Sequence, residues 1–146
     1  MDLFYRKLIP LATQRFKGKV DRGKTPYIEH CLAVANRLEG FDNKILGLLH
    51  DILEDTETTR EELASLGVPS DILDDLDLLT KLPGESRSRN AVRISKSRRA
   101  TMVKIADVTE NTDLRRLKVV RAADIERTNE YLKILSFFRS CHPDLF

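Results

Sequence analysis

The stretch LGLLHDILEDTETT (Leu46–Thr59) places four ionisable residues, His50, Asp51, Glu54 and Asp55, on an apolar run. Burying unpaired charge costs roughly several kcal/mol, so an apolar segment that carries such a cluster needs a partner that neutralises it. A bound metal ion is one such partner. The stretch therefore predicts a charged site built into the core of the protein.

Apolar residues elsewhere in the chain recur at the three- and four-residue spacing of helices. Two stripes follow this spacing: Ile28, Leu32, Ala35 and Leu38, and then Tyr131, Ile134, Leu135 and Phe138. No run keeps a period of two long enough to predict a strand, so we expect an all-α fold. Thr58 and Glu61 fit a capping box that starts a helix, and KLPGES (81–86) predicts a break before a basic helix.

The length of 146 residues suits one domain with one core, which we expect to span residues 1–146. The first residues, MDLFYRKLIPLATQRF, lack the features of a signal peptide, and no stretch approaches the roughly twenty apolar residues that span a bilayer. We therefore expect a soluble protein of the cytoplasm that does not associate with membranes.

Charge is unevenly distributed along the chain. Residues 51–80 contain ten acids and one base, whereas residues 86–100 contain six bases and no acid. Each segment alone could be a solvated helix face. Together they suggest a site that holds a metal ion beside an anion, with Arg87 and Arg89 able to attract phosphates.

Spacing also predicts how the charged residues meet. His30 stands ten residues before Gly40 and His50 ten residues after it, so the two histidines come level if the flanking helices form an antiparallel hairpin. On one continuous helix, Asp51 and Asp55 would share a face. Separately, His30 could bond to backbone, and the acids could be solvated partners of a helix end.

The order of several motifs resembles that of the HD-domain hydrolases of the RelA/SpoT family. An HD pair with ED three residues later is preceded by GKTPYIEH (23–30) and followed by LTKLPGE (79–85) and VKIADVTEN (103–111). The similarity runs from about residue 12 to residue 135. Within the family, the chain resembles the small, stand-alone alarmone hydrolases.

The resemblance implies an HD-type helical bundle that removes the 3′-pyrophosphate of guanosine penta- or tetraphosphate, a small nucleotide substrate. It implies that one divalent metal ion, usually manganese, is bound by four residues: His30, His50, Asp51 and Asp107. Two imidazoles and two carboxylates suit such an ion and leave positions for water and substrate.

The resemblance also implies roles for residues beside the metal. Glu54 and Asp55 would orient the attacking water and handle protons. Asn111, four residues after Asp107, matches a substrate-contacting asparagine. Thr80 and Lys81 match a TK motif whose role could be structural or substrate-binding.

Some substrate contacts depart from the family pattern. The family usually has arginine at the position of Asp21, so Arg22 and Lys24 are expected to cover the same phosphates. Arg87 and Asn90 replace two tyrosines, and Glu110 replaces a common histidine. The metal-binding set is complete while the substrate contacts are altered.

Three other functions stay open at this point. The chain could hydrolyse another nucleotide, or it could be a catalytically silent nucleotide or metal sensor, although a sensor would more naturally have lost a ligand or Glu54. An RNA-binding helix at residues 87–99 is disfavoured because no aromatic side chains interleave its charges.

Overall fold

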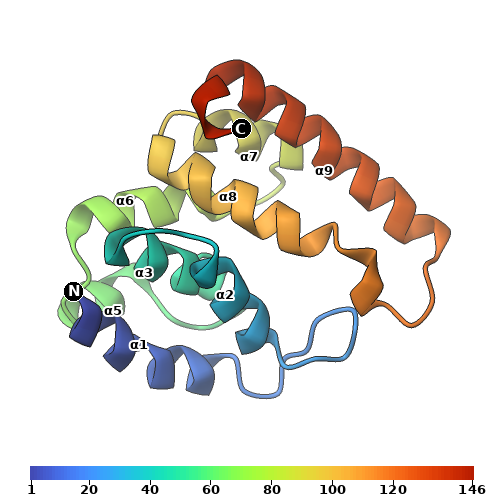
Figure 1. Ribbon diagram of the computed structural model, residues 1–146. Coiled ribbons are helices and arrows are strands. Elements are labelled where there is room, and N and C mark those ends of the chain that lie inside the picture. The colour runs from blue at the N-terminus through green and yellow to red at the C-terminus, as the bar shows by residue number, and fades with distance from the viewer.

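The computed structural model describes residues 1–146 and contains helices without β-strands, which confirms the all-α expectation (Figure 1). None of these helices combines the length and the apolar composition needed to cross a membrane. The helices are α1 (Asp2–Arg15), α2 (Tyr27–Asn36), α3 (Phe41–Leu49), α4 (Ile52–Asp55), α5 (Arg60–Ser65), α6 (Ser70–Leu79), α7 (Arg87–Ile94), α8 (Arg98–Asn111) and α9 (Ala122–Cys141), with short 3-10 helices η1 (Leu114–Arg116) and η2 (Pro143–Leu145).

Helix α8 runs through the middle of the bundle (Figure 1). It contacts the α2–α3 hairpin as well as α6, α7 and α9, and its residues Ala100, Val103 and Val108 are fully buried. Because α8 packs across α2 and α3, its inward-facing residues meet those of the hairpin. This packing positions Asp107 opposite the two histidines.

Helices α2 and α3 approach each other closely at Gly47. A Cβ atom at this position would lie 2.7 Å from Leu38 Cδ1 and 3.2 Å from Ala35 Cα. Gly40, with φ of 82°, forms the tight link between the two helices. The hairpin predicted around Gly40 is therefore present. Because Gly47 has no side chain, the two helices can approach each other closely at this position.

The expected continuous helix through His50 and Asp55 is wrong. Helix α3 ends at Leu49, and the one-turn helix α4 begins at Ile52. Asp51 between them has φ of −108° and ψ of 3°, outside the helical region. The break redirects the side chains of His50 and Asp51 toward α8.

The expected capping box at Thr58 is also displaced by one residue. Thr59 caps α5 by accepting a hydrogen bond from the Glu62 N–H at 3.2 Å. Thr58 is buried, and its hydroxyl oxygen accepts hydrogen bonds from Thr56 and Arg15. Because these contacts occupy Thr58, the exposed neighbour provides the cap.

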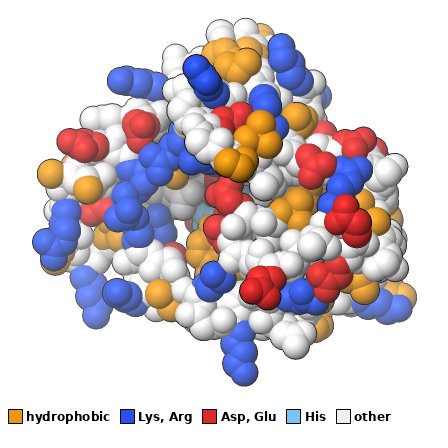
Figure 2. Space-filling view, turned by 180° about the vertical axis from the view of Figure 1, so that it is seen from behind, with side chains coloured by type: hydrophobic (Ala, Val, Ile, Leu, Met, Phe, Trp, Pro, Cys, Tyr) orange, Lys and Arg blue, Asp and Glu red, His pale blue; other side chains and the backbone are white.

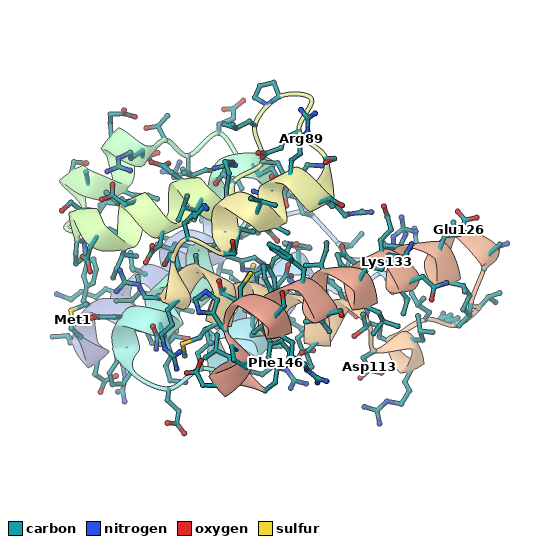
Figure 3. All side chains as sticks on the ribbon, turned by 90° about the horizontal axis from the view of Figure 1, so that it is seen from above. Met1, Arg89, Asp113, Glu126, Lys133 and Phe146 are labelled. Carbon is teal, nitrogen blue, oxygen red and sulfur yellow. The ribbon has the colours of Figure 1, made fainter.

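The expected basic helix is two helices, α7 and α8, and the second continues to Asn111. Ser86 caps α7 by accepting from Arg89 N–H, and Ser97 caps α8 by accepting from Ala100 N–H, both at 3.1 Å. The second cap stabilises a separate helix start at Ser97. Helix α9 then extends beyond the other helices toward Glu126 (Figure 3).

We expect Gly47→Ala to lower the free energy of unfolding by about 1–3 kcal/mol, because the added methyl group would overpack the α2–α3 contact. Urea denaturation of both proteins measures the difference. Alanine is the better helix former by about 1 kcal/mol. A stabilisation of that size would show that the contact with Ala35 has room for a methyl group.

Candidate active site

Four potential metal ligands converge from three parts of the chain. His30 lies on α2, His50 and Asp51 lie at the junction of α3 and α4, and Asp107 lies on α8. One ligand atom from each residue lies within 4.8 Å of all the others. The rings of His30 and His50 have centroids 5.4 Å apart, as the position of Gly40 between them predicts.

Asp107 is the buried centre of this cluster. Its Oδ1 lies 2.9 Å from His30 Nε2 and accepts a hydrogen bond from Asn111 Nδ2 at 2.9 Å. Its Oδ2 pairs with Lys104 Nζ at 2.9 Å. Burial opposes the charged form, but Lys104 and the two histidines hold the pKa of this carboxyl well below its usual range. Asp107 therefore remains ionised and available to a cation.

The surroundings of His50 indicate whether the cluster fits a metal ion. Its Nδ1 donates a hydrogen bond to the Gly47 carbonyl at 2.6 Å, so the lone pair of the neutral ring is on Nε2. This Nε2 atom is buried without a hydrogen-bond partner and lies 2.9 Å from Asp51 Oδ2 and 3.3 Å from Asp107 Oδ1. A lone pair facing two carboxylates requires a cation between them. The donor set therefore fits a divalent metal ion.

Without a metal ion, a proton would supply the missing positive charge. Burial disfavours the charged imidazole, yet Asp51 and Asp107 raise the pKa of His50 well above its usual value. Tyr27 supports the same site by donating a hydrogen bond from its hydroxyl to Asp51 Oδ2. Burial and the charge of Asp51 raise the pKa of Tyr27, which keeps this hydroxyl a donor.

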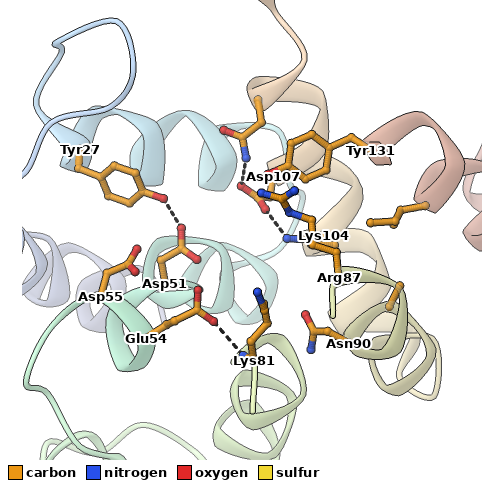
Figure 4. Close-up of a pocket in the computed structure, with 13 residues that line it drawn as sticks. Tyr27, Asp51, Glu54, Asp55, Lys81, Arg87, Asn90, Lys104, Asp107 and Tyr131 are labelled. Atoms are coloured by element: carbon orange, nitrogen blue, oxygen red, sulfur yellow. Dashed lines mark hydrogen bonds and ion pairs between the residues drawn. The ribbon is translucent and has the colours of Figure 1, made fainter. Parts of the chain in front are cut away.

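A polar cavity of about 180 Å³ opens beside the cluster (Figure 4). Asp51, Glu54 and Asp55 line one side, and three cations, Lys81, Arg87 and Lys104, belong to its other elements. The remaining lining residues are Tyr27, Asn90, Ala91, Asp107, Asn111, Tyr131 and Ile134. Figure 2 shows acidic side chains in a hollow near the middle of the back face, with Lys and Arg side chains beside it.

Glu54 and Asp55 both face this cavity from α4. Glu54 Oε1 accepts a hydrogen bond from the backbone N–H of Lys81 at 2.8 Å. Burial, together with the charges of Asp51 and Glu54, raises the pKa of Asp55 to about 6. A carboxyl group with such a pKa can accept or release a proton near neutral pH.

The structure brings Asn111 and Arg87 to the cavity but not Arg22 and Lys24. Arg87 lies over the ring of Tyr131, 5.2 Å from its centroid, and its Nη1 pairs with Glu130 at 2.5 Å. Arg22 instead pairs with the buried Asp124 at 3.4 Å. Lys24 sits in a turn with φ of 68° and does not line the cavity.

Acids pair with much of the basic segment 86–100, and of the two residues expected to attract phosphates, Arg87 lines the cavity whereas Arg89 does not. Arg99 pairs with Asp71 and Asp75 at 2.9 and 2.6 Å, so the acidic and basic segments meet. Arg93 pairs with Glu85, and Arg98 pairs with Asp144. Of the six cations in this segment, only Arg87 lines the cavity.

The other residues that depart from the family pattern each have an ion-pair or hydrogen-bond partner nearby in the structure. Asp21 pairs with Arg116 at 3.2 Å, and Glu110 pairs with Arg37 at 2.6 Å. Asn90 Nδ2 donates to the carbonyl of Leu78 at 2.9 Å. These contacts explain how the chain accommodates each residue.

Sequence reasoning missed the contributions of Lys104 and Tyr27. Lys104 stands three residues before Asp107 and therefore shares its helix face, which is a signal that the spacing rule could have detected. Tyr27 belongs to a recognised motif, but its contact with Asp51 crosses 24 residues of chain. No local pattern predicts that contact.

We expect His50→Ala to raise the dissociation constant of the protein for a divalent ion roughly 100-fold or more, because one ligand and its geometry are lost. Calorimetric titration with Mn²⁺ measures this change. His142→Ala is the matched control, since His142 lies outside the cluster and contacts the Ser95 carbonyl. Equal affinities of wild type and His50→Ala would remove His50 from the ligand set.

No protein-family model matches the chain. A probable GTP pyrophosphokinase of Mycobacterium leprae (strain TN) is 32% identical over 118 residues, which are 73% of this chain and 15% of that relative. Guanosine-3′,5′-bis(diphosphate) 3′-pyrophosphohydrolase MESH1 of Xenopus tropicalis is 40% identical over 108 residues, which are 66% of this chain and 60% of that relative. The chain thus spans less than two thirds of the length of either relative.

A solved structure has the same fold as this chain. It is that of a metazoan ortholog of SpoT that hydrolyses ppGpp and plays a role in starvation responses. Its TM-score is 0.82 at 19% identity, and the match covers 97% of this chain and 89% of the other. In sequence, this chain is therefore similar to these two relatives, and in fold to the SpoT ortholog, in line with the resemblance of its motifs to the stand-alone alarmone hydrolases of the RelA/SpoT family.

Proposed function

We propose that the chain is a metal-dependent nucleotide pyrophosphohydrolase that removes the 3′-pyrophosphate of guanosine tetra- and pentaphosphate. The observation that carries the proposal is the cavity in which a buried His–Asp cluster, two further carboxylates and three cations meet. The similarity to MESH1, a 3′-pyrophosphohydrolase by name, supports this substrate.

His30, His50, Asp51 and Asp107 would hold one divalent metal ion, and manganese suits this mixture of imidazole and carboxylate ligands. When bound, such an ion supplies Lewis-acid chemistry by drawing electrons from a phosphate oxygen and making a nearby water more acidic. Lys104 keeps Asp107 ionised, and Tyr27 orients Asp51. These two residues prepare the carboxylates for the ion.

Glu54 and Asp55 would handle the protons of the reaction. The Lys81 N–H occupies Glu54 Oε1, which leaves Oε2 available to a water molecule. In the proposed step, a water oxygen bonds to phosphorus, the bond from phosphorus to the ribose 3′ oxygen breaks, and Glu54 takes the proton of the water. Asp55, with a pKa of about 6, can supply a proton to the leaving 3′ oxygen.

The cations of the cavity would bind the phosphate groups. Lys81, Arg87 and Lys104 come from three different elements and line the same cavity. A guanidinium fork binds phosphate oxygens in pairs, whereas ammonium groups act as point charges. Asn111 would contact the substrate from the same helix face as Asp107.

A nucleotide panel with added Mn²⁺ tests the proposal. We expect guanosine tetraphosphate to release pyrophosphate, and Glu54→Gln to slow this release roughly 100-fold while metal affinity stays the same. Glu57→Gln is the matched control, because exposed Glu57 does not line the cavity. Hydrolysis of another nucleotide instead would reject the proposed substrate, and binding without turnover would indicate a sensor.

We expect Arg87→Ala to raise the Michaelis constant and to flatten its dependence on salt, because ions screen the attraction of Arg87 for phosphate. The turnover number should change little, since the metal ligands and Glu54 are untouched. Steady-state kinetics between low and high salt measure both constants. Arg89→Ala should match wild type because exposed Arg89 does not line the cavity, and an equal effect of the two substitutions would contradict a phosphate contact by Arg87.

A further inference from the structure

The loop that joins α6 to α7 reaches the site through its backbone. We call residues 80–86 the Lys81 loop. The Lys81 N–H donates to Glu54 Oε1 at 2.8 Å, the contact drawn in Figure 4. Because this donor is a backbone group, its position depends on the conformation of the loop. The orientation of Glu54 therefore depends on whatever holds the loop in place.

Arg93, on α7, binds the loop at two points. Its Nη2 donates to the Thr80 carbonyl at 2.9 Å. Its Nε and Nη2 donate to the two carboxylate oxygens of Glu85, at 2.7 and 2.8 Å. Glu85 Oε1 also accepts a hydrogen bond from Leu82 N–H at 3.1 Å. The two anchors lie on either side of Lys81 along the chain.

Packing does not hold this loop. Residues 81–84 are all exposed, so few apolar contacts restrain them. The Glu85 side chain, by contrast, is 8% exposed, and the hydrogen bonds from Arg93 lower its pKa to about 2. A planar guanidinium that binds a carboxylate with two bonds fixes geometry as well as charge. The hydrogen bonds of Arg93 to Glu85 and to the Thr80 carbonyl, which we call the clamp, therefore restrain the loop.

We propose that Arg93, paired with Glu85, is a positioning residue for Glu54. Arg93 does not line the cavity, so it acts on the site through the Thr80 carbonyl and the Lys81 N–H. This inference rests on the proposed function, in which Glu54 takes the proton of the attacking water. It gives one cation of the basic segment a role in catalysis without contact with the substrate.

A double-mutant comparison of turnover numbers tests the proposal. We expect Arg93→Met to lower the turnover number on guanosine tetraphosphate about tenfold, because the hydrogen bond to Glu54 is weakened rather than Glu54 removed. In a Glu54→Gln background, the same substitution should change turnover less than twofold, because both act through one group. A further tenfold loss in that background would overturn the proposal.

Arg99→Met is the matched control for loss of ion pairs. Arg99 also binds α6, through Asp71 and Asp75, but it does not touch the Lys81 loop. Its turnover number should stay near wild type, with a melting temperature lowered as much as that of Arg93→Met. An equal loss of turnover in Arg99→Met would assign the effect to general stability and overturn the proposal.

A measurement without substrate separates this inference from the proposed reaction. In amide NMR spectra, Glu54→Gln and Arg93→Met should both move the Lys81 N–H resonance, and Arg93→Met should speed its hydrogen exchange about tenfold. Arg99→Met should leave this amide unchanged. If these shifts occur while no nucleotide is hydrolysed, the clamp is supported and the proposed reaction fails. An unchanged Lys81 amide in Arg93→Met would overturn the clamp.

Discussion

The buried carboxylate of Asp107 is the contact on which the arrangement of the site depends. A charge in this position is stable only if its neighbours compensate it, and here they come from different helices. Lys104 and Asn111 approach from α8 itself, while His30 and His50 approach from the α2–α3 hairpin. The same contacts hold α8 against the hairpin and gather the candidate ligands for a metal ion. Fold and site are therefore stabilised by one set of interactions.

The break between α3 and α4 directs the ionisable side chains of this segment toward the site. A continuous helix would satisfy the Gly47 carbonyl with a backbone N–H, whereas here the imidazole Nδ1 of His50 binds it. That bond directs the lone pair of Nε2 toward Asp51 and Asp107. The short helix α4 then carries Glu54 and Asp55 along the cavity wall. This local break in the helix separates the candidate metal ligands from the residues proposed to transfer protons.

Several cations near the site are paired with acids outside the cavity. Arg93 is paired with Glu85 of the Lys81 loop, Arg99 with acids of α6, and Arg22 with Asp124. These pairs are only partly buried, so each contributes modestly to stability. The pair of Arg93 and Glu85 also affects geometry, because it holds the Lys81 loop that borders the site. Lys81, Arg87 and Lys104 remain directed to the cavity.

Helical periodicity and motif spacing are local properties of a chain, so the sequence sufficed to predict the helical class and the hairpin around Gly40. The four candidate metal ligands were predicted through the family resemblance, which added Asp107 to the set. The sequence alone did not predict that α3 breaks before Asp51, where His50 comes to face Asp107, a residue of α8 that is distant in sequence. The partner of Arg22 lies 102 residues away, and no spacing rule connects the two. Tertiary packing settles which acid each cation meets and which cations line the cavity, since both depend on through-space distance and burial; Arg87 and Lys104 line it although each also has an acidic partner.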